Sequence, residues 1–73
     1  MKAEVVHVSK WTCHAPPKTE LYWVEVLTEN NKLIQFMRGA TNSPPDNLWE
    51  GDEVEIVYRK HKEDDLILPF IVT

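Results

Sequence analysis

Apolar residues in this chain recur mainly at every second position, which is the period of a β-strand rather than that of a helix. The clearest stretch is Glu20–Thr28, which is rich in the aromatic and β-branched residues that strands favour. Either of its two faces could point inward on sequence grounds. The alternation predicts five strands in all: Lys2–Ser9, Glu20–Thr28, Leu33–Arg38, Glu53–Arg59 and Leu66–Val72.

Segments with turn chemistry separate the predicted strands. Glu29–Lys32 contains two adjacent asparagines, which tolerate positive φ and predict a tight hairpin turn. Within Gly39–Gly51, Ser43 as a helix N-cap followed by Pro44 at the first helical position predicts one short helical turn. Pro69 cannot donate a ladder hydrogen bond, so the last strand is expected to lie at a sheet edge or to carry a bulge.

The first strand is expected to end before a stiff connection. Strict alternation in Lys2–Ser9 places Ala3 and Val5 on one face, and Val6 and Val8 on the other. The following segment, Trp11–Thr19, contains two adjacent prolines and is predicted to be a loop.

The length of the chain and the number of strands restrict the architecture. A chain of 73 residues supports a single domain, spanning 1–73, around one core. Five short strands are too few for an ordinary two-sheet sandwich, whereas a curled sheet or half-open barrel buries the apolar face. The segment Trp49–Arg59 resembles the glycine, aspartate and alternating-strand element of small SH3-like and OB-fold barrels. The predicted fold is therefore all-β: a five-stranded curled sheet or half-open barrel, SH3-like or OB-like, with one short helical turn.

Side chains suited to catalysis or metal binding are sparse. Cys13 is the only cysteine, and the adjacent His14 does not give the paired spacing of structural zinc ligands. The chain has two glycines and no glycine-rich phosphate loop. Glu53 and Glu55 share one strand face, where alternating acids ordinarily keep a surface hydrated. We expect a non-enzymatic protein with no catalytic residue, metal site or cofactor.

The chain carries no sequence signal for a membrane or for secretion. No apolar stretch approaches the roughly 18 residues that a membrane span needs. Met1–Glu4 does not begin a secretory signal peptide. The expected location is cytoplasmic, with no membrane partner.

The net charge of −4 arises in the second half of the chain. Residues 1–36 hold four acids and four bases, whereas residues 37–73 hold eight acids and four bases. This asymmetry favours a larger protein partner with a basic region over a nucleic acid, whose phosphates an acidic surface repels. Exposed tryptophans are enriched at binding hot spots. The predicted partner-binding residues are Trp11, Trp49, Glu50, Asp52, Glu53 and Glu55.

A single-stranded nucleic-acid-binding, OB-like module is the alternative function. A basic run follows the fourth predicted strand, and an aromatic side chain on the sheet would stack on bases. The residues assigned to this alternative are Arg38, Arg59, Lys60, Lys62 and Trp23.

In its small size, its acidity and its lack of a catalytic set, the chain resembles the small transcription regulators that bacteriophages encode. The resemblance involves no residue motif and assigns no site. It implies a bacterial RNA polymerase subunit as partner, inhibition of promoter use and antitermination as activities, and the host cytoplasm as location.

Overall fold

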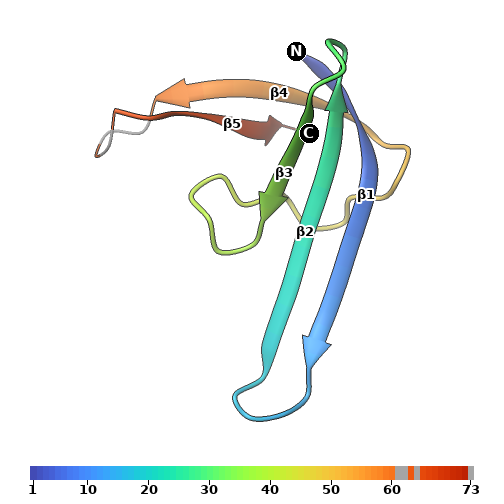
Figure 1. Cartoon of the computed structure of the whole chain (residues 1–73), viewed down its shortest axis with the longest axis vertical. Coiled ribbons are helices and arrows are strands. Elements are labelled where there is room, and N and C mark those ends of the chain that lie inside the picture. Colours follow the sequence, from blue (N-terminus) through green and yellow to red (C-terminus); the bar gives the residue numbers. More distant parts are fainter. Residues whose placement is uncertain (61–62, 64, 73) are drawn as a thin grey trace.

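The structure, a computed structural model, describes residues 1–60, 63 and 65–72, and over these residues it contains strands and no helix. Five antiparallel strands form one open sheet in the order β3-β2-β1-β4-β5 (Figure 1). The all-β curled sheet is confirmed. Its strands are β1 (Lys2–Cys13), β2 (Thr19–Thr28), β3 (Leu33–Met37), β4 (Glu53–Lys60) and β5 (Ile67–Val72).

Strand β1 is longer than the alternation predicted. Its last residues pair with the start of β2, with Trp11 opposite Leu21 and Cys13 opposite Thr19. The predicted loop Trp11–Thr19 is therefore wrong at both ends, and only residues 14–18 connect the two strands. Tryptophan and threonine favour extended backbone, and cross-strand partners extend the ladder as far as the prolines allow.

A register shift between Val5 and His7 also changes the faces of β1. Val6 is the extra residue of this β-bulge, and the two sides of the strand exchange after it. Val8 consequently pairs with Val24 and shares the inner face with Val5, although strict alternation predicted them on opposite faces. The error arose because one inserted residue reverses every later assignment.

The predicted helical turn after Ser43 is not present. The segment bends at Asp46 and Asn47, and Asn47 has a φ of 69°, which is incompatible with a right-handed helix. Pro45 is held instead by the sheet, because its carbonyl oxygen accepts a hydrogen bond from the Tyr22 hydroxyl at 3.0 Å. The buried side chain of Leu48 then packs into the core.

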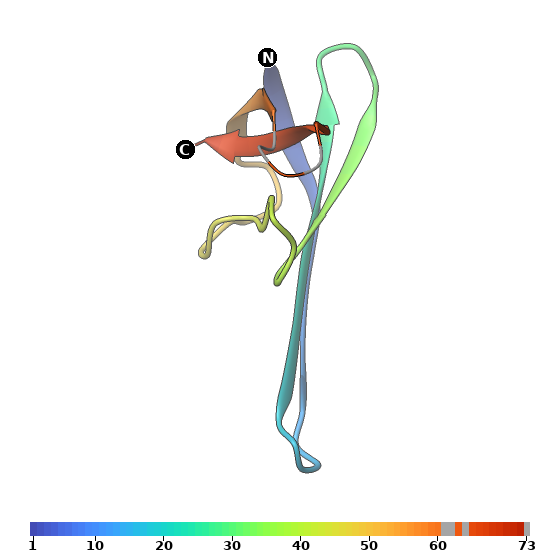
Figure 2. The ribbon, with the colours of Figure 1, turned by 90° about the vertical axis from the view of Figure 1, so that its left-hand side faces the viewer.

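The core lies between two layers. Figure 2 shows β4, β5 and the segment 39–52 on one side of the layer formed by β1, β2 and β3. The opposite side of that three-stranded layer has no covering element among the described residues. The inner face of β2 is the one that carries Tyr22 and Val24. The buried core consists of Ala3, Val5, Tyr22, Val24, Val26, Ile34, Phe36, Leu48, Val54 and Ile56.

Strands β3 and β5 are the two ends of the sheet, so over the described residues the sheet is open rather than closed into a barrel. Pro69 lies in β5, which confirms the prediction of an edge strand there. A membrane-spanning helix is not found in the part of the chain that the structure describes.

Tyr22 links the loop to the sheet, and its ionisation should affect stability. Burial raises the pKa of its hydroxyl above the ordinary value of 10.0. Above about pH 10 the unfolded chain therefore loses this proton first, and stability should fall as the pH rises. Tyr22→Phe should cost about 1 kcal/mol at neutral pH through the lost hydrogen bond, and should reduce the alkaline fall.

Urea unfolding between pH 7 and pH 11 measures both effects. Tyr58→Phe is the matched control: Tyr58 is 42% exposed, so this variant should keep the wild-type stability at neutral pH. An alkaline loss of stability in Tyr22→Phe equal to that of the wild type would contradict the assignment.

Candidate protein-binding surface

Hydrogen bonds fix the backbone of Trp49, whereas its side chain is exposed to solvent. Its N–H donates to the Asp52 carboxylate at 2.9 Å, and the Asp52 N–H donates back to the Trp49 carbonyl at 3.1 Å. The same turn is tied to β1, because Val5 donates to the Asp52 carbonyl and accepts from the Gly51 N–H, both at 2.8 Å. The Trp49 residue is nevertheless 73% exposed. A fixed turn thus displays a large apolar side chain to solvent.

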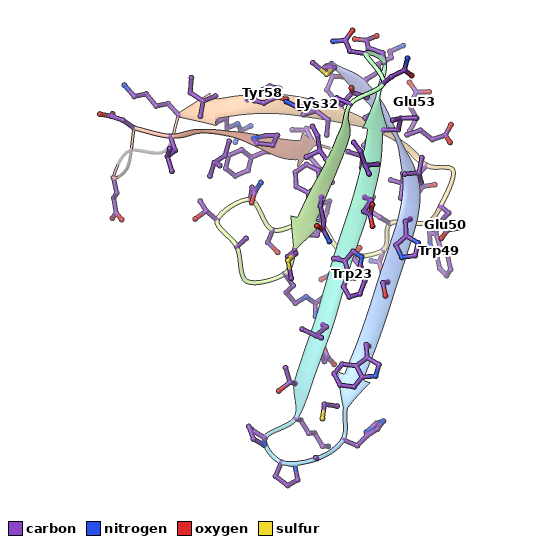
Figure 3. All side chains as sticks on the ribbon, in the orientation of Figure 1. Trp23, Lys32, Trp49, Glu50, Glu53 and Tyr58 are labelled. Carbon is purple, nitrogen blue, oxygen red and sulfur yellow. The ribbon has the colours of Figure 1, made fainter. Side chains whose placement is uncertain are left out.

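A hollow of about 390 Å³ lies beside this turn, between it and β1. Figure 3 shows Trp49 and Glu50 together, next to the edge of β1 that faces away from β2. The floor is apolar, through Val8 and Leu48, while Glu50 supplies a carboxylate at the rim. The full lining is Val8, Lys10, Asn47, Leu48, Trp49 and Glu50.

The predicted acidic residues differ in the partners that their carboxylates have within the protein. Asp52 accepts the Trp49 N–H and so has a structural role within the turn. Glu53 lies 3.7 Å from the Lys2 ammonium, and Glu55 lies 3.4 Å from the amino terminus of Met1. These ion pairs are solvent-exposed and therefore weak.

Glu50 lines the same hollow as the Trp49 indole and contributes a negative charge to it. Its carboxylate lies 3.8 Å from Nδ1 of His7, a side chain that is charged only when protonated. Trp49 and Glu50, with the hollow between them and β1, form the part of the predicted site that the structure brings together. We call it the Trp49 surface.

Trp11 does not belong to the Trp49 surface. It is four residues beyond His7 on β1, about 13 Å further along the strand. It pairs with Leu21, so its indole lies on the face opposite to the one occupied by Val8. Trp11 is 55% exposed, but it stands apart from the acidic residues.

The outer face of the three-stranded layer is an apolar surface that the sequence analysis missed. The sequence did contain a signal for this surface: both faces of β2 are apolar, whereas one apolar face is enough to form a core. The exposure values are 38% for Leu21, 57% for Leu33 and 48% for Met37. The apolar side chains of this face are Trp11, Leu21, Trp23, Leu27, Leu33 and Met37.

The basic residues of the nucleic-acid alternative lie in separate places and have local partners. Arg38 contacts the carboxylates of Glu20 and Asp46. Arg59 lies over the ring of Phe70, with its guanidinium carbon 5.8 Å from the ring centroid. The Lys60 ammonium lies 3.3 Å from Asp65.

The two remaining residues of that alternative do not complete a common surface. Trp23 is partly buried on the outer face of β2, where its ring centroid lies 6.3 Å from that of His7. Lys62 lies outside the described residues. The described members of the set therefore do not form one basic groove with an aromatic base.

Within residues 1–60, 63 and 65–72, no three His, Cys, Asp or Glu side chains gather as a metal site would require. The thiol of Cys13 is free and partly buried at the end of β1. No protein-family model, characterised protein or solved structure was found to match the chain.

Proposed function

We propose that this protein is a non-enzymatic, protein-binding regulator that acts by occupying a surface of bacterial RNA polymerase through the Trp49 surface. The observation that carries the proposal is the 73% exposure of Trp49 on a turn held by three backbone–backbone hydrogen bonds and by one from the Trp49 N–H to the Asp52 carboxylate. The polymerase as partner comes from the resemblance to small phage-encoded transcription regulators.

The exposed indole supports binding because it has no role in the core. Leaving a large aromatic side chain in water forgoes the stabilisation that burial provides, on the order of 25 cal/mol per Å² of apolar surface. The turn also fixes the backbone beforehand, which reduces the conformational entropy lost when a partner binds. Tryptophan in such a setting is typical of a binding hot spot.

Charge supports a basic patch on the partner. The chain carries a net charge of −4, and Glu50 stands directly beside Trp49. Complementary charges at an interface raise the association rate more than the affinity. A small acidic domain of this kind regulates by excluding other contacts, so inhibition of promoter use or antitermination requires no chemistry from its own residues.

Binding to purified bacterial RNA polymerase core enzyme tests the proposal. Biolayer interferometry with the immobilised protein should show saturable binding, and run-off transcription from a promoter template should change in yield. No binding to the polymerase, together with a salt-sensitive shift of a single-stranded RNA 20-mer, would replace the proposal with the nucleic-acid alternative.

Glu50→Lys should slow association with the polymerase severalfold at low ionic strength, and by less near 0.15 M salt, where charges are screened beyond about 8 Å. Glu29→Lys is the matched control, because it changes the net charge equally at an exposed site in the β2–β3 turn. Association rates measured at several salt concentrations give the comparison. Equal slowing by the two variants would show that net charge, not the Trp49 surface, sets the rate.

A further inference from the structure

Beyond Glu4, one edge of strand β1 has no strand partner among the described residues. Strand β4 pairs with β1 only over Lys2–Glu4, and the last backbone contacts on that side are made by Val5 with Gly51 and Asp52. The remainder of β1, from Val6 to Cys13, pairs with β2 on its other side only. An open strand edge of this length presents unpaired backbone donors and acceptors to any extended chain.

The hydrogen bonds of the neighbouring strands show which groups point outward. Arg38 donates its N–H to the Tyr22 carbonyl at 2.9 Å, so the backbone groups of Tyr22 face β3. Lys10 of β1 lies opposite Tyr22 of β2. Because the backbone groups of Tyr22 point to β3, the two residues form a non-hydrogen-bonded pair, and the N–H and C=O of Lys10 point away from β2. Lys10 therefore faces the open edge, and the alternation gives Val8 and Thr12 the same direction.

The hollow of the Trp49 surface adjoins this edge. Val8 and Lys10 line it from the strand, and Trp49 lines it from the turn. The Lys10 ammonium lies 5.2 Å from the centre of the Tyr22 ring, so this side chain is turned onto the inner face and away from the edge. Backbone groups and an apolar recess thus lie side by side.

We propose that an extended segment of the partner adds to the sheet as a strand beside Val8–Thr12, with an apolar side chain against Trp49 and a basic side chain at Glu50. Only an extended backbone matches alternating donors and acceptors, while the recess and the carboxylate select its side chains. The inference rests on the proposed function, because it describes how the same surface meets its partner.

Charge favours a basic partner over a second copy of this chain at the β1 edge. Two copies would each bring a net charge of −4 to the contact. The other free edges are less suitable, because β5 contains Pro69 and β3 has five residues.

A synthetic hexapeptide of alternating lysine and valine, titrated into the ¹⁵N-labelled protein, tests the edge independently of the polymerase. The amide signals of Val8, Lys10 and Thr12 should shift most. The same peptide with every second amide N-methylated retains its charge and side chains but loses the strand pairing, and it should shift them at least tenfold less. Shifts confined to β3 or the outer face, or equal for the two peptides, would overturn the inference. Concentration-dependent shifts at these amides without peptide would also overturn it, in favour of a second copy.

Proline substitution tests the same edge in the complex with RNA polymerase core enzyme. Lys10→Pro removes an outward N–H that β2 does not use, and should weaken binding at least tenfold. Gln35→Pro is the matched control, because Gln35 pairs with Glu25 and directs its N–H to the free edge of β3. Gln35→Pro should stay within about threefold of the wild type. Lys10→Ala removes the same side chain but keeps the N–H, so Lys10→Pro should weaken binding about tenfold more than Lys10→Ala does.

The outcomes separate the inference from the proposed function. Normal polymerase binding by Lys10→Pro overturns strand addition and leaves the function standing. Peptide docking on β1 without any polymerase binding supports the edge and rejects the polymerase as partner. Circular dichroism and melting curves of the two proline variants should match, since each replaces an exposed residue at an open edge.

Discussion

Replacing Phe36 with alanine should lower the free energy of unfolding by about 3–5 kcal/mol. Phe36 is 1% exposed and is the largest of the fully buried side chains. Its ring lies between the three-stranded layer and the elements that cover it, so its removal leaves a cavity that the surrounding strands cannot close. A domain of this length has a total stability of only about 4–11 kcal/mol. The variant should therefore lose much or all of its cooperative transition in urea.

The adjacent residue is a control for this loss. Met37 follows Phe36 on β3 but points to the outer face, where it is 48% exposed. Met37→Ala should change the free energy of unfolding by less than about 1 kcal/mol. Equal losses from the two variants would mean that both faces of β3 are covered in solution.

Much of the fold follows from the sequence because strand periodicity is a local property. The predicted strand Glu20–Thr28 differs from β2 by one residue, and the turn at Glu29–Lys32 is present, with a φ of 61° at Asn31. Edge placement of Pro69 also follows from one residue, because a missing N–H is incompatible with an interior strand.

The features that escaped the sequence analysis depend on contacts between distant segments. The bulge at Val6 is defined only by the register against β2, and no residue in the first strand marks it. The segment after Ser43 has good helix-start chemistry, yet the Tyr22 hydroxyl and the burial of Leu48 hold it in another conformation. Tertiary contacts outweighed a weak local preference there.

The candidate site was predicted in part for the same reason. Trp49 and Glu50 are neighbours in sequence and remain neighbours in space. Trp11 was grouped with them by residue type alone, but the extended β1 carries it away and turns it to the outer face. Lys10 and the open β1 edge were missed, because an unpaired edge becomes visible only when strand order is known.

Trp49→Ala should weaken binding to RNA polymerase core enzyme by at least 2 kcal/mol, or roughly 30-fold in Kd, the size typical of a hot-spot tryptophan. The indole supplies one wall of the hollow, and the strand proposed beside β1 would bury its apolar side chain against it. Stability should change by less than about 0.5 kcal/mol, because the residue is 73% exposed and the hydrogen bonds that hold the turn do not involve the indole.

Trp11→Ala provides the matched comparison, since it removes the same side chain from another exposed position. If the Trp49 surface is the interface, Trp11→Ala should bind within about threefold of the wild type. A large loss from Trp11→Ala with little from Trp49→Ala would instead move the interface to the outer face of the three-stranded layer, where Trp11 and Leu21 lie together. A loss of fold in Trp49→Ala would assign that indole to the core in solution, and the exposure on which the proposed function depends would then be wrong.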